Sequence, residues 1–321
     1  MSGRTPLWLT VIAVYLLACL TGCAKQANLA LKFAPEDTTT YKVSTQMIKD
    51  VRFEQPSLTP PKIEENQSGT TVDVTFQQKI DKVQSDGSAL ATVTIKEVAY
   101  IVKAKDAMKF DFDSTRKADK DKPFAGVLGQ SYTIKISPSG VVEVVDAKDA
   151  RSAVTSGYEA RVAKALFSDD GIRKRHSIPA LPDIAGSNLK TGKSWVRIVG
   201  SPPGLPSPKT FKKIYTLESV EGPEDNQVAT VLMNAVESAE PAPDAGKQSA
   251  GMGAFAKMFD ATETYTGKMV LALGAGKVLQ FNEKLVATYL ATEEPKGGSG
   301  GKGPDVLTMR LTQSVGMEIV E

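Results

Sequence analysis

Histidine and cysteine are nearly missing from this 321-residue sequence, which has one histidine and two cysteines. A Ser–His–Asp or Cys–His catalytic site would have to use His176, because histidine is the usual base near neutral pH. That residue ends the run Arg173-Lys-Arg-His176, whose cations would lower its pKa. Cations at a helix end are favoured by the helix dipole, so we interpret the run as a solvated basic segment and His176 as non-catalytic. The sequence also predicts no metal site, since no second histidine or free cysteine is present to share one.

A strong charge imbalance is lacking as well. The sequence has 39 Lys and Arg against 37 Asp and Glu, whereas nucleic-acid-binding proteins normally present a basic surface, so we exclude nucleic acid as a partner. Tryptophan is scarce, and Trp195 is the only one beyond the first 22 residues. Sugar sites usually stack on aromatic rings, which disfavours a glycosidase. Two carboxylates that meet only in the folded chain remain an open alternative.

A single long apolar run is present, from Leu7 to Leu20, without charge, glycine or proline. It is shorter than the ~20 residues that span a bilayer and suits a signal peptide. The following Leu20-Thr-Gly-Cys23 resembles the lipobox of bacterial lipoprotein precursors. The resemblance implies a signal peptide over residues 1–22, cleavage between Gly22 and Cys23, and lipidation of Cys23 with diacylglycerol, palmitate being an expected acyl chain.

Cleavage would leave Cys23 as the only cysteine, already lipidated, so we expect no disulfide in an exported protein. The hydrophobic core must then stabilise the fold by itself, and about 300 residues are ample for that. Ala24 follows Cys23, whereas an Asp there would resemble an inner-membrane retention signal. We therefore predict a cell-envelope protein held on a membrane by its lipid, on the outer membrane where the cell has two.

Period-2 apolar patterns dominate the rest of the chain and predict antiparallel strands with one wet face. Three hairpins are expected, with a bulge near Glu97 in the first; they cover residues 72–102, 132–144 and 211–236. The segment Val51–Thr70 is rich in Pro, Glu, Gln and Ser and is interpreted as a long loop. One helix is predicted, from Asp149 as N-cap to about Ser168 with Gly171 as the stop, because apolar residues fall four apart at Val154, Tyr158, Val162 and Leu166.

The second half of the chain repeats the first in outline. Ala91-Thr-Val93 corresponds to Ala229-Thr-Val231, and Tyr132-Thr133 to Tyr265-Thr266, at a period of about 135 residues. We therefore predict a mainly β (α+β) protein, built from two similar antiparallel β-meander halves with one main helix between them. Its expected parts are a signal peptide (1–22), a lipidated tether (23–38), an N-terminal half with the helix (39–176), a Pro-rich connector (177–208) and a C-terminal half (209–321).

Two motifs have the form of functional sites but the wrong context. Gly297-Gly-Ser-Gly-Gly301 matches the nucleophile elbow G-x-S-x-G, yet its Pro-, Lys- and Gly-rich flanks predict a flexible loop instead of a strand and a helix. Four aspartates could begin a Ca²⁺ site, but no EF-hand spacing follows, and the first two alternate with phenylalanines as the wet face of a strand would (Asp111, Asp113, Asp119 and Asp121).

Two short stretches carry a family resemblance. They are Leu31-Lys-Phe-Ala-Pro-Glu-Asp-Thr38, with Tyr41 and Val43 after it, and Leu189-Lys-Thr-Gly-Lys-Ser-Trp195. Together they resemble a family of uncharacterised bacterial lipoproteins, classed as a domain of unknown function. Glu36 replaces the family's first glycine and Lys193 an acid. The resemblance implies an exported, β-rich, lipid-anchored protein without catalytic residues. In architecture it is distantly similar to outer-membrane lipoprotein carriers that hold acyl chains in a half-barrel.

Three functions remain open. The favoured one is a non-enzymatic envelope protein without a cofactor, attached to a membrane through Cys23, whose sheets bind a lipid, a peptide or an envelope protein. The alternatives are a structural spacer and a surface hydrolase with a carboxylate pair. An apolar cavity would favour the first, a closed core the spacer, and a cleft with two close carboxylates the hydrolase. The sequence assigns no ligand-binding residues.

Overall fold

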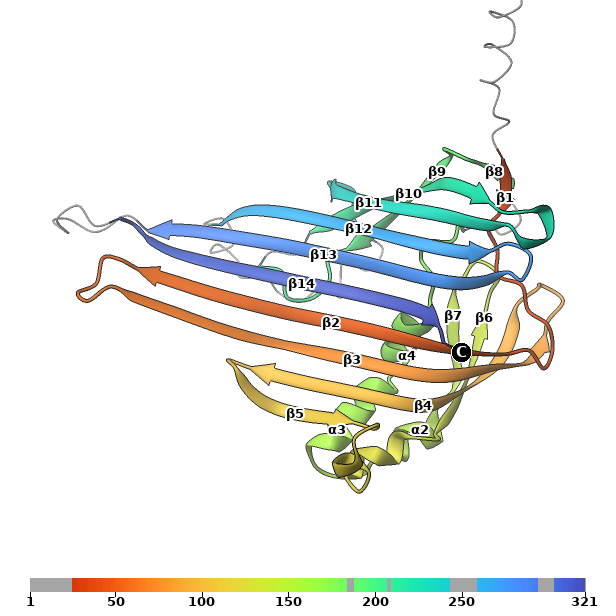
Figure 1. Ribbon diagram of the computed structural model, residues 1–321, viewed down its shortest axis with the longest axis horizontal. Helices are drawn as coiled ribbons and strands as arrows, with labels where there is room; N and C mark the ends of the chain where they lie inside the picture. Colours follow the sequence, from red (N-terminus) through yellow and green to blue (C-terminus); the bar gives the residue numbers. More distant parts are fainter. Residues whose placement is uncertain (1–24, 184–187, 207–208, 243–258, 294–302, 321) are drawn as a thin grey trace, which may run out of the picture.

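The computed structural model describes residues 25–183, 188–206, 209–242, 259–293 and 303–320. The predicted signal peptide, Cys23 and the glycine-rich segment Gly297–Gly301 lie outside these ranges. Mainly β structure is confirmed, because twelve strands of the described chain form one large antiparallel sheet (Figure 1).

Five long strands occupy the middle of this sheet, each with 15 to 22 residues, and are followed on both sides by shorter ones. The sheet order is β7-β6-β4-β3-β2-β14-β13-β12-β11-β10-β9, with β5 paired to β4. The first set of strands comprises β2 (Thr38–Gln55), β3 (Lys62–Val83), β4 (Ala89–Ala104), β5 (Ala107–Asp113), β6 (Ser131–Ile136) and β7 (Val142–Asp146). The second comprises β9 (Ser194–Gly200), β10 (Thr210–Glu221), β11 (Val228–Ser238), β12 (Asp260–Ala272), β13 (Lys277–Glu293) and β14 (Asp305–Ile319).

The two sets are joined edge to edge by β2 and β14, which pair in register from Tyr41–Ile319 to Glu54–Val306. The repeated motifs occupy comparable places, since Ala91–Val93 in β4 and Ala229–Val231 in β11 each lie on a strand next to the one that carries its Tyr-Thr partner. One continuous sheet therefore includes both predicted halves.

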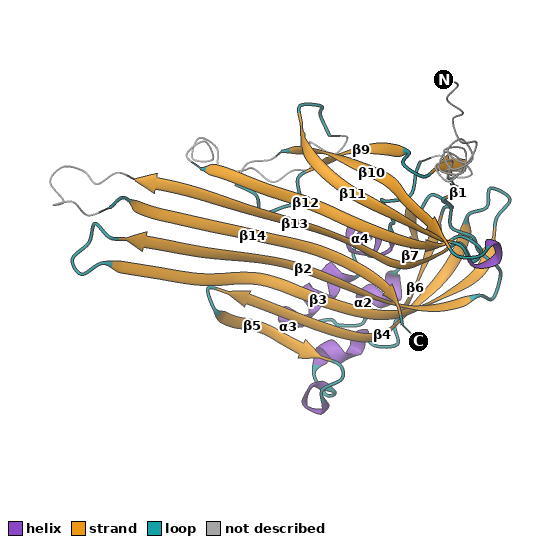
Figure 2. Ribbon diagram, turned by 45° about the horizontal axis from the view of Figure 1, so that its top comes forward, coloured by secondary structure: helices purple, strands orange, loops and turns teal. Residues whose placement is uncertain are grey.

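Along the chain, three short helices follow the first set of strands and precede the second. They are α2 (Lys148–Ser152), α3 (Gly157–Leu166) and α4 (Asp169–His176), and Figure 2 shows them together on one face of the sheet. The remaining elements are a second, two-stranded sheet of β1 (Gln26–Asn28) and β8 (Asn188–Lys190), and the 3₁₀ turns η1 (Lys117–Asp119), η2 (Pro123–Val127) and η3 (Glu224–Asn226).

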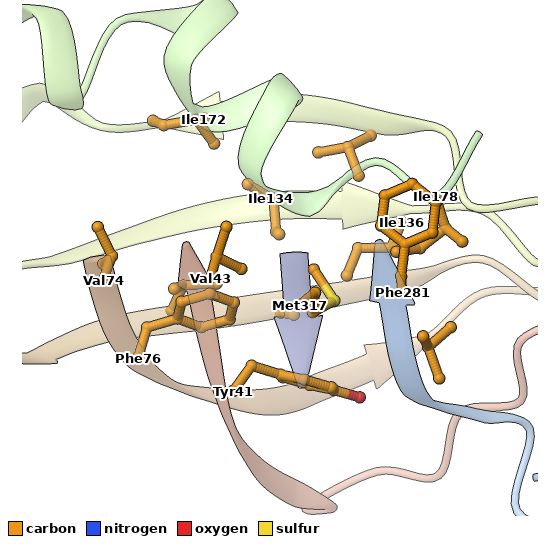
Figure 3. Packing of buried hydrophobic residues seen from close by; sticks show 14 of the residues in the cluster. Tyr41, Val43, Val74, Phe76, Ile134, Ile136, Ile172, Ile178, Phe281 and Met317 are labelled. Atoms are coloured by element: carbon orange, nitrogen blue, oxygen red, sulfur yellow. The ribbon is translucent and has the colours of Figure 1, made fainter. Parts of the chain in front are cut away.

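The core fills the space between the inner face of the sheet and these helices. Alternate residues of β4 are completely buried, as its period-2 pattern predicts (Ala89, Ala91, Val93 and Ile95). In Figure 3, Ile134 and Ile136 of β6 and Ile172 of α4 face Val43 and Phe76 across the core. A second, smaller hydrophobic cluster lies farther along the long strands and includes Phe211, Leu285, Tyr289, Met309 and Leu311.

The single long helix was predicted wrongly. Its residues form two helices, α2 and α3, because the first ends at its C-cap Ala153 and the second starts only after its N-cap Ser156. A third helix, α4, then follows directly after Ser168. The hydroxyl of Ser168 accepts a hydrogen bond from the backbone N–H of Gly171 at 3.0 Å, which starts α4. Gly171 therefore lies inside a helix and stops none, and the N-cap of α2 is Ala147 instead of Asp149.

The predicted loop Val51–Thr70 is also wrong. Most of it extends β2 and β3, which pair from Thr38–Lys79 to Gln55–Lys62, so the prolines mark only the turn at 56–61. Polar residues suit this hairpin because both of its faces remain partly exposed. The bulge near Glu97 is confirmed, since Thr75 pairs with Glu97 and Phe76 with Ile95.

The expected tether and connector also contain ordered strands. Within residues 25–38, β1 pairs with β8, and Ala27 and Leu29 are buried. The backbone N–H of Leu31 donates to Pro138 O at 2.8 Å, which fastens this segment to the β6–β7 turn. Residues 177–208 likewise contain β8 and β9. Within the described ranges, no helix has the length and apolar character to cross a membrane.

Candidate ligand-binding cavity

A cavity of about 610 Å³ lies between the middle of the long strands and α4. This volume falls within the range of roughly 300–1,000 Å³ that is typical of small-molecule sites. Its floor is formed by inward-facing side chains of β2, β3, β13 and β14, most of them apolar (Val43, Met47, Val72, Val74, Phe281, Glu283, Leu285 and Val315). The opposite wall comes from the ends of α3 and α4 and two proline-containing loops (Leu166, Arg173, Lys174, Arg175, Pro179, Pro202 and Pro203).

The cavity exists because the strands are longer than the elements that cover them. β3 has 22 residues, equivalent to about 70 Å of extended chain, whereas α4 has eight residues, about 12 Å of helix. Phe281 belongs to the main hydrophobic cluster and Leu285 to the second one, and both line the cavity. The gap between the two clusters therefore lies over the intervening inward residue, Glu283.

Glu283 is bound within the protein by three donors. Its carboxylate accepts from Lys213 Nζ at 2.5 Å, from Tyr215 Oη at 3.0 Å and from Tyr265 Oη at 3.3 Å. Lys213 also lies 4.5 Å from the centre of the Tyr265 ring, and Trp195 stacks on Tyr215. Lys213 and Glu283 are each 5% exposed, so the pair is buried, and Glu283 is the member that lines the cavity.

The two tyrosines remain protonated donors in this cluster. Burial, followed by the nearby Glu283 carboxylate, raises the pKa of both Tyr215 and Tyr265 far above the ordinary value of a phenol. The oxygens of the Glu283 carboxylate are thus occupied by donors from within the protein. The cluster therefore supplies a polar, internally neutralised patch in the cavity wall.

Three consecutive cations of α4 border the cavity. Arg173 and Lys174 are exposed, and Arg173 Nη2 lies 3.0 Å from Asp170 Oδ1. Arg175 is buried and donates to Tyr132 Oη at 2.9 Å and to Leu166 O at 2.7 Å. Arg173 and Lys174 can therefore meet a ligand at the cavity edge, whereas Arg175 holds α4 against β6.

His176 is buried, contrary to the solvated segment predicted for it, because α4 turns this side chain into the core. It is 4% exposed, its Nε2 lies 2.7 Å from Tyr132 Oη, and its ring packs 4.5 Å from the ring of Phe76. Since Arg175 donates to Tyr132 Oη, the Tyr132 proton is free to donate to Nε2 of a neutral imidazole. Burial, with a smaller effect of Arg175, holds the His176 pKa well below its usual value.

A second, much smaller cavity of about 40 Å³ lies beside His176. An ion pair between Lys277 Nζ and Asp37 Oδ2, 2.8 Å apart, lines it together with Tyr41. Burial, and then the Asp37 charge, raises the pKa of Tyr41 to about 12. A space of this size has room for water and is too small for a ligand comparable to that of the main cavity.

Two of the four aspartates weighed for calcium, Asp111 and Asp119, have cationic partners instead. Asp119 is bound by Arg116 and Lys122, with Nη2–Oδ2 and Nζ–Oδ1 distances of 2.5 and 2.6 Å, and it accepts from the Asp113 backbone N–H at 2.8 Å. Arg116 also makes two hydrogen bonds to Asp111. Among the described residues, no group of three or more His, Cys, Asp or Glu side chains is arranged to hold a metal ion.

Sequence reasoning missed the residues of the cavity, and one signal for them was available. Lys213 interrupts the inward stripe of Phe211, Tyr215 and Leu217 in β10, and Glu283 interrupts that of β13. A charged residue at an inward position predicts a buried partner. Cys23, Gly22 and the segment Gly297–Gly301 lie outside the described residues, so their predicted roles stay predictions.

Comparisons with known proteins add little to this description. No protein-family model matches the chain, and no curated protein matches it. A solved structure of lipid–protein interactions in lipovitellin is similar with a TM-score of 0.37 and 10% sequence identity, over 90% of this chain and 26% of that one. A likeness at this level supports no conclusion about function, and the resemblance to uncharacterised lipoproteins stays a prediction.

Proposed function

We propose that this chain is a non-enzymatic, lipid-anchored protein of the cell envelope that holds an apolar ligand, such as a lipid, between its sheet and α4. The observation that carries the proposal is the cavity of about 610 Å³ over the apolar floor of the long strands. Apolar side chains left in contact with water are a favourable surface for a hydrocarbon, and each methylene moved from water into such a site contributes about 0.8 kcal/mol.

The lining also separates this proposal from its two alternatives. A spacer needs only a closed core, and a cavity between two hydrophobic clusters would serve no purpose in it. A hydrolase with paired carboxylates needs two acids facing one cleft. Among the described residues that line the cavity, Glu283 is the only acid, and its oxygens are occupied by Lys213, Tyr215 and Tyr265.

Anchoring through Cys23 would hold the sheet close to the membrane. Two residues, Ala24 and Lys25, separate Cys23 from β1, and β1 pairs with β8. A lipid on Cys23 would therefore be followed almost directly by ordered structure. A carrier or sensor of membrane lipids benefits from this arrangement, because its ligand source stays within a short distance.

Native mass spectrometry tests the binding proposal. The protein is made with Cys23→Ser, so that no covalent lipid is attached, and is purified under mild conditions. We expect an adduct of apolar small molecules that is lost on denaturation. Val315→Trp, which places a large ring in the cavity, should remove the adduct. Thr312→Trp adds the same ring on the other face of β14 and should retain it.

A wild-type mass without any adduct, unchanged after incubation with lipid extract, would overturn the proposal. The same holds for an adduct of equal abundance in Val315→Trp and Thr312→Trp, provided that both variants keep the circular dichroism spectrum of the wild type. Ligand would then lie elsewhere or bind without selectivity.

A further inference from the structure

The charges around the cavity are concentrated at its edge, whereas its floor is mostly apolar. Arg173 and Lys174 stand at the edge formed by α4, where both side chains are exposed. The apolar floor lies across from them, with Phe281 on β13, Val43 on β2 and Val74 on β3 pointing toward the helices (Figure 3). A ligand that fits both parts must have a polar end and an apolar end.

The sign of the charge on the ligand's polar end follows from which of the protein's charges around the cavity are already compensated. Three cations line the cavity, and Glu283 is the only acid that does so among the described residues. Glu283 is neutralised by Lys213, and Arg173 is paired with the exposed Asp170. Arg175 donates to two neutral acceptors, the Tyr132 hydroxyl and the Leu166 carbonyl, and Lys174 adds a further positive charge. The charge that remains at the edge is therefore positive. A cationic head group would be repelled there, and a neutral one would gain nothing from it.

Because the two cations are exposed to water, an anionic head group can bind at this position without losing all of its hydration. The Arg173 side chain is 46% exposed and its partner Asp170 is 75% exposed, so this ion pair is weak and water can reach it. An anionic head group between Arg173 and Lys174 would keep part of its hydration while its chain enters the cavity. It would thus avoid most of the desolvation cost of burying a charge.

We infer that the ligand is an anionic amphiphile, with its head group held by Arg173 and Lys174 and its hydrocarbon chain along the floor between Phe281 and Leu285. The inference rests on the proposed function, since it names the chemical class of ligand for the same cavity. A free fatty acid and an acidic phospholipid share this chemistry, one through a carboxylate and the other through a phosphate.

Calorimetric titration of the full chain with matched probes tests the inference. Dodecanoate and 1-dodecanol have the same chain length and differ in head-group charge. We expect dodecanoate to bind about ten-fold more tightly, equivalent to about 1.4 kcal/mol, and to lose this advantage at high salt, which screens exposed charges. Lyso-phosphatidylglycerol then distinguishes the sources, since tighter binding than dodecanoate would favour a phosphate head group and weaker binding a carboxylate.

Charge-neutral variants locate the head group. Arg173→Gln with Lys174→Gln should weaken dodecanoate binding about ten-fold and leave dodecanol binding unchanged. Lys148→Gln with Lys164→Gln removes the same charge from α2 and α3, at residues that do not line the cavity, and should bind both probes like the wild type.

Equal affinity for dodecanoate and dodecanol in the wild type would overturn the inference and leave the proposed function standing. So would unchanged dodecanoate binding in the Arg173/Lys174 variant. Binding of none of the three probes would instead overturn the proposed function itself. Both substituted side chains are exposed, so the fold should persist, and the thermal unfolding midpoint verifies this for every variant.

Discussion

Lys213 and Glu283, 70 residues apart in the chain, form a buried ion pair in the wall of the cavity, with 2.5 Å between Nζ and Oε2. They lie on β10 and β13, with β11 and β12 between them in the sheet order. The pair can span these strands because their side chains project from the same face of a curved sheet. Each of these two charges is thus compensated by the other.

Removing one member of this pair should therefore be costly. Lys213→Met would leave the Glu283 carboxylate buried without its cation, and we expect a loss of roughly 3–5 kcal/mol in the free energy of unfolding. The double variant Lys213→Met with Glu283→Leu should recover most of that loss, because it leaves no uncompensated charge. Urea denaturation of the wild type, both single variants and the double variant measures this, and additive losses in the double variant would contradict the coupling.

Acid should destabilise the protein through His176. Its pKa is lowered in the folded state by burial, so below the ordinary value of about 6.5 the unfolded chain binds a proton that the folded chain does not. Stability contributed by neutral His176 is complete above pH 6.5 and decreases as the pH falls, by at most about 1.4 kcal/mol per pH unit. Urea denaturation at pH 7.5, 6.5 and 5.5 follows this decrease.

His176→Gln is the matched variant, because an amide oxygen can still accept the hydrogen bond from Tyr132 but does not titrate near neutral pH. We expect it to have a flatter stability profile between pH 6.5 and 5.5 than the wild type. Parallel profiles for the two proteins would show that His176 can be protonated without loss of the fold.

The Asp119 carboxylate should stabilise the loop after β5. Hydrogen bonds from Lys122 and from the Asp113 backbone lower its pKa to about 2. Its contribution is therefore complete above the ordinary aspartate pKa of about 3.9 and is lost as the pH falls toward 2. Asp119→Asn should lower the thermal unfolding midpoint at pH 6 and less so at pH 3. Asp121→Asn, on the exposed neighbour, should leave the midpoint nearly unchanged, and equal effects of both substitutions would contradict this role.

Lipidation should depend on Cys23 alone. In cells fed labelled palmitate, we expect the wild type and Cys19→Ala to incorporate label, since Cys19 lies within the predicted signal peptide. Cys23→Ala should incorporate none and should fail to fractionate with membranes through a lipid. Label in Cys23→Ala, or its absence from the wild type, would show that the Leu20–Cys23 motif is not a lipobox.

Strand patterns could be recognised from the sequence where one face is buried. Alternation in β4, β6, β10 and β11 placed their hairpins correctly, because an inward residue every second position is a local property of a half-buried strand. The distal half of the β2–β3 hairpin was missed, since both faces remain partly exposed there and polar residues hide the period. The helix break between Ser152 and Gly157 was missed because Ser156 looks ordinary within an apolar four-residue period.

The sequence by itself determined the β class of this protein, its antiparallel hairpins, the near balance of its charges and the motif that predicts an anchor at Cys23. Each of these depends on neighbouring residues, composition or a short motif. Only the tertiary structure decided that β2 and β14 close the two sets of strands into one sheet, that His176 is buried and that Lys213 meets Glu283. The cavity was also decided only by the tertiary structure, because it results from strands that extend past the helices covering them. The difference in length between segments far apart in the sequence cannot be recognised from any local pattern.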